Sequence, residues 1–364
     1  MFELKTLLER CAEYDASDLH LKAGSPPVLR IDGELVPQGT TPISEEDTDR
    51  FVDELLVPEQ KEIFYQTHEV DTAYSVKGLG RFRTNIYMQR GSISIAMRRI
   101  KSSIQSFQEL HLPPIVELIA QRRHGLVLVT GVTGSGKSTT LAAIIDYINK
   151  NRRVHIVAIE DPIEYLHTDN LALIDQREVS IDTPSFASAL KSVLRQDPDV
   201  ILIGEMRDPE TFHAAISATE TGHLVFSTLH TADAKQTIDR IIDLFPPGQH
   251  DQIRAQLALN LRAIMCQRLL PRADGTGRVP AVEVMIANPS IRKLIHENRI
   301  SQIPTAMQSA RKDGMQTFND SLKYLFDNKL ITKEDAMIYS DNPDELAMNL
   351  QGIYLSQSKG GILR

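Results

Sequence analysis

Hydrophobic positions at the start of the chain recur at helical spacing and then give way to shorter apolar runs. One helical face holds Phe2, Leu4, Leu7, Leu8 and Cys11. This pattern predicts an amphipathic helix that packs on its own domain rather than on a membrane. Between residues 27 and 100 the apolar runs are short, and Asp32-Gly33 between two of them is typical of a hairpin turn. We therefore predict a small α+β domain over residues 1–100.

A polar stretch with adjacent prolines follows this first region. Residues 101–114 begin with KSSIQS and end with Pro113-Pro114, and a proline disfavours helix in the residue before it. We place the linker between two domains at 101–114.

Beyond the linker, apolar runs of strand length alternate with segments of helical spacing. The strand-like runs are 126–130, 154–159, 200–203 and 224–227, and the helical segments are 141–148 and 186–194. Strands that alternate with helices require crossover connections, which predicts an α/β domain with a largely parallel sheet over residues 115–289. Residues 290–364 are mainly helical in pattern, with helices expected around 291–295, 318–326 and 333–339.

Composition and charge narrow the classes of protein that this chain can be. At 364 residues, 41% hydrophobic and 24% charged, it has the size of two globular domains. The net charge of −8 disfavours nucleic acid as a partner, because a phosphate backbone requires excess Lys and Arg. Cys11 and Cys266 lie far apart, which supports neither a disulfide framework nor a cysteine zinc site. No apolar stretch approaches the ~18 residues of a membrane span, so we expect a cytoplasmic protein that reaches a membrane only through a partner.

The most specific chemical motif is GVTGSGKS, from Gly131 to Ser138. It follows a predicted strand and precedes a predicted helix, as a phosphate-binding loop (P-loop) requires. Its glycines let backbone N–H groups turn inward at the positive end of the helix, where they hold phosphate oxygens. Lys137 is expected to reach the β and γ oxygens, and Ser138 to ligate Mg²⁺. We therefore predict ATP and Mg²⁺ as cofactors, with nucleotide contacts from Gly131, Thr133, Gly134, Ser135, Gly136, Lys137, Ser138 and Thr139.

Carboxylates follow two of the predicted strands. The run 200–203 ends in Gly204-Glu205, where Asp-Glu is more usual, so Glu205 is the candidate to hold the metal through bound water. The run 154–159 leads into Glu160, Asp161 and Glu164. One of these three acids is expected to be the general base. The local sequence does not choose among them, because an acid at a strand end also caps turns.

Two histidines and several arginines are further candidates. His223 and His230 bracket the run 224–229, and their separation places them on opposite faces of a straight strand, which argues against a shared zinc ion. His230 follows the strand end, where a γ-phosphate sensor would lie, whereas for His223 sensing and packing are equally compatible with the pattern. The first domain offers arginines that either solvate its surface or reach a neighbouring subunit's nucleotide: Arg81, Arg83, Arg98 and Arg99.

With these motifs together, the sequence resembles the secretion ATPase superfamily of type II secretion and type IV pilus systems. The resemblance spans essentially the whole chain, through DASDLHL at 15–21, PPVLRIDGEL at 26–35, GRFRTNIYMQRG at 80–91, EDPIEY at 160–165, LRQDPDVILIGEMRD at 194–208 and TGHLVFSTLHT at 221–231. It implies a PAS-like N-terminal domain joined to a RecA-like P-loop NTPase domain. It also implies a homo-hexameric ring with ATP bound between domains and neighbouring subunits.

The resemblance assigns roles to acids and histidines. The segment from Glu160 to Glu164 matches the family's Asp box, with Glu164 at the position of the catalytic glutamate. Glu205 matches its atypical Walker B acid, and His223 and His230 match its His box. The resemblance thereby implies nucleotide contacts from Glu160 and His223 as well.

The resemblance also implies partners. Arg81 and Arg83 lie in the region that matches the family's nucleotide-reaching arginines. The expected partner is a PilC-like platform protein of the inner membrane, at whose cytoplasmic face the ring would act. Paralogous ATPases are possible further partners.

Two features favour pilus retraction over assembly within this family. Assembly relatives carry an extra N-terminal domain and a four-cysteine zinc site, and we expect neither here. The family's retraction-associated AIRNLIRE segment corresponds to SIRKLIHE at 290–297, with departures at Ser290, Lys293 and His296. We therefore expect a Mg-ATP-driven motor of pilus retraction and twitching motility. The alternatives are an accessory retraction paralogue, an assembly ATPase of pilus or type II secretion systems, a nucleic-acid translocase and a scaffold without turnover.

Overall fold

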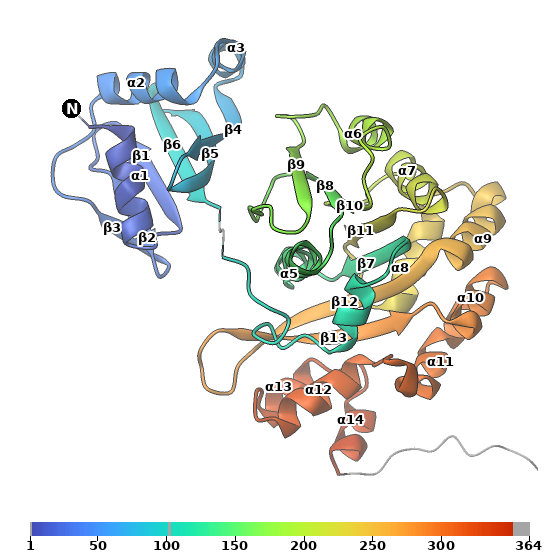
Figure 1. The fold of residues 1–364 in the computed structure, drawn as a ribbon. Helices are drawn as coiled ribbons and strands as arrows, with labels where there is room; N and C mark the ends of the chain where they lie inside the picture. The colour runs from blue at the N-terminus through green and yellow to red at the C-terminus, as the bar shows by residue number, and fades with distance from the viewer. Residues whose placement is uncertain (1, 101–102, 352–364) are drawn as a thin grey trace, which may run out of the picture. The chain divides into compact units, whose positions relative to one another are not determined.

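The computed structural model describes residues 2–100 and 103–351. The chain forms two compact units, one of residues 1–103 with 163–166 and the other of residues 104–162 with 167–364. Each unit has its own sheet and its own hydrophobic core (Figure 1). Residues 101–102 of the predicted linker and 352–364 of the predicted C-terminal region lie outside the described residues.

The first unit is an antiparallel sheet packed against helices. Its strand order is β3-β2-β1-β6-β5-β4, and each neighbouring pair is antiparallel. The strands are β1 (Asp18–Lys22), β2 (Val28–Ile31), β3 (Glu34–Pro37), β4 (Glu69–Val76), β5 (Gly80–Gln89) and β6 (Ser92–Arg99), and the helices are α1 (Leu4–Glu13), α2 (Glu45–Leu55) and α3 (Pro58–Thr67).

Both local predictions for this region are confirmed. α1 buries the predicted apolar face in the core of the first unit, through Leu4, Leu7, Leu8 and Cys11. Asp32 and Gly33 connect β2 to β3 with φ angles of 49° and 88°. Two consecutive positive φ angles match the right-handed twist of the flanking strands, which is why Asp-Gly suits this turn.

The second unit is built on a mostly parallel sheet with the order β13-β12-β7-β11-β10-β8-β9. All neighbouring pairs are parallel except β12 and β13. The strands are β7 (Gly125–Thr130), β8 (His155–Glu160), β9 (Leu173–Glu178), β10 (Val200–Ile203), β11 (Leu224–Leu229), β12 (Leu261–Pro271) and β13 (Arg278–Ile286). Every residue of β7, β10 and β11 is buried, as a parallel sheet covered on both faces requires. The predicted α/β class is confirmed.

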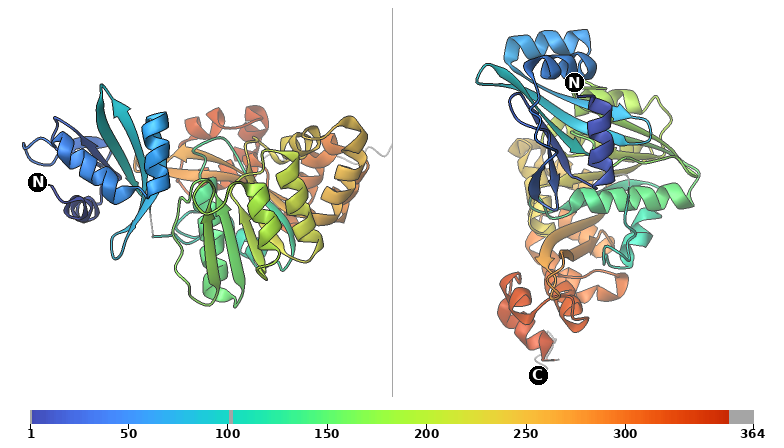
Figure 2. Two further views of the ribbon diagram at one scale, coloured as in Figure 1. Left: turned by 90° about the horizontal axis from the view of Figure 1, so that it is seen from above. Right: turned by 90° about the vertical axis from the view of Figure 1, so that its left-hand side faces the viewer.

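Helices cover both faces of this sheet (Figure 2). Val127 and Val129 of β7 pack with α4 and α5, whereas Leu126 and Leu128 face the core that includes α6 to α9. The helices are α4 (Ile115–Ala120), α5 (Lys137–Asn151), α6 (Phe186–Val193), α7 (Pro209–Glu220), α8 (Ala234–Asp243), α9 (His250–Asn260), α10 (Pro289–His296), α11 (Ile303–Ser309), α12 (Phe318–Asp327), α13 (Lys333–Ile338) and α14 (Pro343–Leu350), with 3-10 turns η1 (Pro247–Gln249), η2 (Ile300–Gln302) and η3 (Arg311–Asp313). Across the described ranges, no helix has both the length and the apolar character to cross a bilayer.

Two parts of this sheet were not predicted. The hairpin of β12 and β13 adds a long antiparallel edge, and β9 forms the opposite edge. Most of β12 is buried without regular alternation, so its sequence, LRAIMCQRLLP, lacks the period of two that marks a half-exposed strand. The expected helices after residue 290 are present as α10, α12 and α13.

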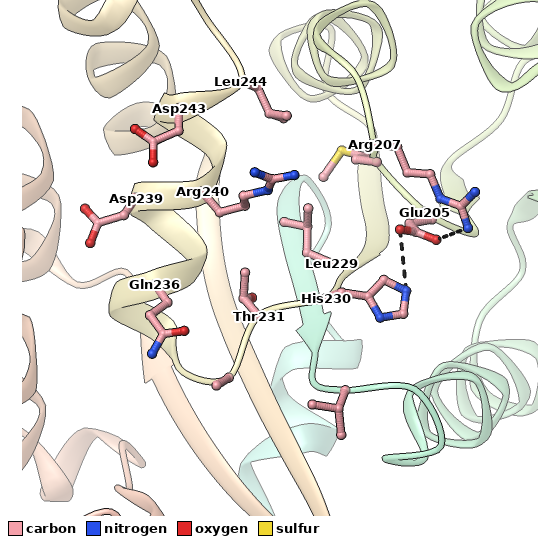
Figure 3. Close-up of a pocket in the computed structure, with 13 residues that line it drawn as sticks. Glu205, Arg207, Leu229, His230, Thr231, Gln236, Asp239, Arg240, Asp243 and Leu244 are labelled. Atoms are coloured by element: carbon pink, nitrogen blue, oxygen red, sulfur yellow. Dashed lines mark ion pairs between the residues drawn. The ribbon is translucent and has the colours of Figure 1, made fainter.

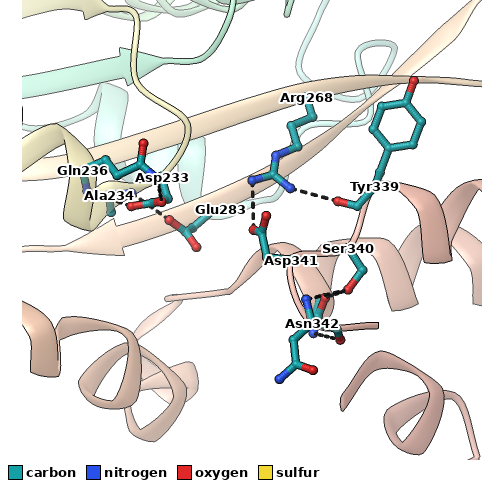
Figure 4. Close-up of polar contacts among 10 residues, drawn as sticks. Asp233, Ala234, Gln236, Arg268, Glu283, Tyr339, Ser340, Asp341 and Asn342 are labelled. Carbon is teal, nitrogen blue, oxygen red and sulfur yellow. Dashed lines mark hydrogen bonds and ion pairs between the residues drawn. The ribbon is translucent and has the colours of Figure 1, made fainter. Parts of the chain in front are cut away.

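Arg268 fastens the C-terminal helices to β12 (Figure 4). Its guanidinium donates to the Asp341 carboxylate and to the Tyr339 carbonyl, each at 2.9 Å. It also lies 3.9 Å from the ring centroid of Phe318, at a distance where a cation–π attraction contributes. Through Arg268, β12 therefore contacts the segment between α13 and α14.

Candidate active site

The carboxyl ends of β8, β10 and β11 are held in fixed register at one edge of the sheet. The Gly204 N–H donates to the Ile159 carbonyl at 2.8 Å, and the Thr228 hydroxyl donates to the Gly204 carbonyl at 2.6 Å. The Met206 N–H donates to the Thr228 carbonyl at 3.2 Å. In parallel sheets this edge is where ligands bind, and β7 leads into the P-loop at the same edge.

The P-loop adopts a backbone that only glycine supports at its start. Gly131 has a φ of 147°, and a Cβ there would lie 2.4 Å from the Ser135 Oγ and 2.5 Å from the Gln267 carbonyl oxygen. Gly134 and Gly136 also have positive φ angles, of 76° and 93°. These three positions therefore have backbone conformations that favour glycine.

Lys137 begins α5 with its ammonium group turned back over the loop. Its Nζ donates to the carbonyls of Gly131 at 2.8 Å and Val132 at 3.1 Å, and the residue is buried. The Ser135 Oγ is also buried and makes no hydrogen bond. An ammonium group and an unpartnered hydroxyl at a helix N-terminus are suited to phosphate oxygens.

Ser138 and Thr139 occupy the first turn of α5, and Thr133 is exposed in the loop. Among residues 2–100 and 103–351, no cluster of three or more His, Cys, Asp or Glu side chains could hold a metal by itself. Magnesium bound with ATP needs few protein ligands, because phosphates and water supply most of its oxygens. The hydroxyl of Ser138 and the carboxylate of Glu205 are oxygen donors of the right type, so the residues fit this ion.

Gln267 is a P-loop neighbour that sequence reasoning missed. It is almost fully buried on β12, and its Nε2 donates to the Thr140 hydroxyl at 2.8 Å. Its backbone carbonyl is the atom that leaves no room for a Cβ at Gly131. The residue is far from the motif in sequence, so no local signal could have identified it.

Glu205 lies between a guanidinium and an imidazole (Figure 3). Its Oε2 is 2.7 Å from Arg207 Nη2, and its Oε1 is 3.5 Å from His230 Nε2. Burial raises the pKa of Glu205, but the hydrogen bond and charge of Arg207, together with His230, outweigh burial and lower that pKa overall. The structure therefore brings two predicted residues, Glu205 and His230, within 3.5 Å of each other, with Arg207 on the other side of the carboxylate.

A cavity of about 770 Å³ adjoins this cluster. Its lining joins the P-loop, the ends of β10 and β11, and α8, through Val132, Glu205, Met206, Arg207, Leu229, His230, Thr231, Ala232, Gln236, Asp239, Arg240, Asp243 and Leu244. The side chains of Arg207 and His230 come from neighbouring strand ends (Figure 3). The cavity gives polar groups on three elements a common space beside the P-loop.

The remaining candidate acids lie at the end of β8 and in the segment that follows it. Glu160 accepts a hydrogen bond from Gln176 Nε2 on β9 at 3.0 Å. Asp161 and Glu164 are exposed, and Glu164 belongs to the segment 163–166 that groups with the first unit. Glu160 is therefore tied to β9, whereas Asp161 and Glu164 are open to solvent.

His223 does not lie near the P-loop of its own unit. It precedes β11, and its carbonyl accepts from the N–H of Gly125, the first residue of β7. Its ring Nδ1 contacts the Ala218 carbonyl at 2.8 Å. The parallel pairing of β7 with β11 puts His223 and His230 at opposite ends of the strand, so the predicted nucleotide contact from His223 has no support within the unit.

The first-domain arginines lie on one strand pair of the first unit. Arg81 and Arg83 alternate with the buried Phe82 along β5, so both project from the same face. Arg83 stands opposite Arg98 of β6, whose Nε donates to Asp18 at 2.8 Å.

Comparison with known proteins places the chain in a family. Residues 4–336 match the family model described as type II/IV secretion system protein. The chain is 42% identical to the type IV pilus ATPase PilU of Pseudomonas aeruginosa, over 96% of this chain and 91% of that protein. It is also 42% identical to that organism's type IV pilus retraction ATPase PilT, over 92% and 97%.

A solved structure agrees with these relatives. The crystal structure of the pilus retraction motor PilT with bound ADP matches with a TM-score of 0.88 and 45% identity, over 95% of this chain and 99% of that one. This similarity extends through both units rather than the P-loop region alone. The chain therefore belongs to the type II/IV secretion system protein family and is an ATPase of that family.

Proposed function

We propose that this chain is the Mg-ATP-hydrolysing subunit of a type IV pilus retraction motor. The relatives that match nearly its full length include a pilus retraction ATPase and a further pilus ATPase, and α10 with its C-cap residue Glu297 forms the retraction-type segment SIRKLIHE. The observation that carries the proposal is the P-loop conformation, with Lys137 enclosed by its carbonyls beside the Glu205 and His230 cluster.

Each side chain then has a defined task. Lys137 and the loop amides bind the β and γ phosphates, and Ser138 and Glu205 hold Mg²⁺, directly or through water. Bound Mg²⁺ neutralises charge on the phosphate oxygens. Glu164 accepts a proton from the water that attacks the γ phosphorus, while the bond to the leaving ADP oxygen breaks. His230 contacts the γ-phosphate and reports its presence to the Glu205 cluster.

Mechanical work requires more than one subunit. In our proposal six copies form a ring at the cytoplasmic face of the inner membrane and act on a platform protein of the pilus machine. Arg81 and Arg83 approach a nucleotide held by the neighbouring copy, because a guanidinium aimed at the γ-phosphate stabilises the charge that develops during transfer.

Two measurements test this proposal. Purified protein should release phosphate from ATP in a Mg²⁺-dependent way, and Lys137→Ala should lose nucleotide affinity. Expression in a piliated host that lacks its own retraction ATPase should restore pilus retraction, and Lys137→Ala should not. Turnover without restored retraction would assign the ATPase to another task, and stimulation by single-stranded DNA would point to a translocase.

An accessory retraction role is the second candidate, because the chain is as similar to PilU as to PilT by identity, 42% in both cases. The same host experiment separates them. A retraction motor restores movement in a host without either ATPase, whereas an accessory ATPase restores it only beside an intact retraction motor.

A further inference from the structure

Arg207 is a guanidinium among strand-end carboxylates for which the sequence predicted no role. Its side chain is 71% exposed, whereas its partner Glu205 is 18% exposed. The hydrogen bond to Glu205, the charge of that carboxylate and, more weakly, the charge of Asp161 raise the pKa of Arg207. Arg207 is therefore paired with the acid that follows β10.

Glu205 and Arg207 both line the cavity, and so does Met206 between them, although it also packs in the core. The Met206 N–H is held by Thr228. Asp208 caps α7 by accepting from the Thr211 N–H at 2.8 Å. The backbone on both sides of Arg207 is thus held by hydrogen bonds, whereas its long side chain is largely exposed.

The cavity places the Arg207 side chain in the same space as the P-loop. Val132 of the P-loop and Arg207 line the same space, and Lys137, whose Nζ contacts the Val132 carbonyl, marks where the phosphates bind. The Arg207 guanidinium is largely exposed, so solvent screens part of its attraction to Glu205. A guanidinium binds phosphate with two parallel hydrogen bonds, so a terminal phosphate in this space competes effectively with the Glu205 carboxylate.

We propose that Arg207 is an exchange residue of this ATPase site. It holds Glu205 when no terminal phosphate is present, and it moves its guanidinium to the γ-phosphate when ATP binds. The move leaves Glu205 free to hold the metal-bound water. ADP lacks the γ-phosphate, so the Arg207–Glu205 pair persists with ADP. The inference rests on the proposed ATP-driven function and adds the residue that distinguishes triphosphate from diphosphate.

The test measures the preference for triphosphate over diphosphate. Full-length parental protein, Arg207→Ala and Arg207→Lys are titrated with ADP and with ATPγS, both with Mg²⁺, and kcat and KM for ATP are measured in parallel. Arg299→Ala is the matched control, because Arg299 pairs with Glu297 at the same spacing of two residues, 3.2 Å apart, away from the P-loop.

The expected result is a selective loss. Arg207→Ala should lower the ratio of ATPγS to ADP affinity by about tenfold, within the usual range of coupling between sites, and should lower kcat. Arg207→Lys should recover part of both, and Arg299→Ala should match the parent. An unchanged affinity ratio in folded Arg207→Ala overturns the inference, as does an equal loss for both nucleotides. If Arg207→Ala does not fold, the ratio in Arg207→Lys decides in the same way. A parental protein that hydrolyses ATP while the ratio stays unchanged refutes this role alone, whereas a parent without turnover refutes the proposed function.

Discussion

At the residue scale, two glycines of one loop differ in why they must be glycine. Gly131 and Gly134 both have positive φ angles. A Cβ at Gly131 would meet the Ser135 hydroxyl and the Gln267 carbonyl below 3.0 Å, whereas at Gly134 it would meet nothing within 4 Å. Gly131 must therefore be glycine because a side chain would not fit there, whereas at Gly134 the positive φ angle alone disfavours other residues.

We predict that Gly131→Ala disrupts nucleotide binding more than Gly134→Ala. The first substitution displaces the loop or β12, and we expect more than about tenfold weaker ATP binding, which corresponds to ~1.4 kcal/mol. The second adds mainly left-handed strain of about 1–2 kcal/mol. Calorimetric titration of both variants with Mg-ATP checks the order. Equal affinities would show that the contact between Gly131 and β12 has no influence on the site.

The general base is a second prediction at this scale. Glu164→Gln should keep ATP affinity and lose about 100-fold or more in kcat, since a positioned base contributes about 10²–10⁴. Glu160→Gln and Asp161→Asn are the comparison variants, because Glu160 is the last residue of β8 and Asp161 follows it. Phosphate release under saturating ATP separates the three. A larger loss in either comparison variant would move the base to that residue.

The sequence predicted those site residues that a contiguous motif holds together. Lys137 and Glu205 follow strand ends, and alternating strands and helices determine which ends share an edge. Gln267 and Arg207 were missed for different reasons. Gln267 reaches the P-loop only through the pairing of β12 with β7, whereas Arg207 was visible in GEMRD but resembled an ordinary surface arginine until its contact with Glu205 was known.

At the element scale, the buried strands that were predicted from the sequence are those whose residues are continuously apolar. The central strands β7, β10 and β11 are short apolar runs that stand out between helices. β12 and β13 are mostly buried but mix polar residues with apolar ones, including Gln267, Arg268 and Glu283. These polar residues make specific contacts with the P-loop helix, the C-terminal helices and α8, so they interrupt the hydrophobic pattern for a structural reason.

Glu283 illustrates the energetic effect of one such polar residue. It accepts a hydrogen bond from the Ala234 N–H at the start of α8, at 2.9 Å (Figure 4). Burial raises the pKa of Glu283 to about 7, assisted by the charges of Asp233 and Asp341 and opposed by that hydrogen bond and by Arg268. Between the ordinary pKa of 4.5 and the raised value of about 7, the folded protein therefore keeps a proton on Glu283 that the unfolded chain has released.

Stability from this group is consequently present at low pH and is lost as pH rises toward 7. We predict that Glu283→Gln raises Tm relative to the parent at pH 8, by the equivalent of about 1–3 kcal/mol, and changes it little at pH 5. Glu297→Gln is the control, because Glu297 is a surface partner of Lys293 and Arg299. Thermal melts at both pH values give the comparison. The same Tm difference at pH 5 and pH 8 would contradict the buried proton.

At the scale of the whole molecule, the question is whether one chain contains a complete site. The second unit supplies the P-loop, Glu205, His230 and Arg207. Arg81 and Arg83 belong to the first unit, where they share one face of β5. Our proposed ring assigns these arginines to the nucleotide of a neighbouring copy. The loss of Arg81 and Arg83 in one copy should therefore impair the site of its neighbour.

Mixing two inactive variants tests that assignment. Lys137→Ala cannot bind the phosphates but keeps its arginines, and Arg81→Ala with Arg83→Ala keeps the P-loop but lacks the arginines. Each alone should show little turnover. In mixed rings some sites combine an intact P-loop with arginines from a neighbour, so activity should recover to a fraction of the parental rate, up to about one quarter for random pairing of equal amounts. Recovery should vanish under conditions that dissociate the ring, as followed by light scattering. If the mixture stays as inactive as its parts while rings form, each site draws its arginines from its own chain, because only then does mixing create no complete site.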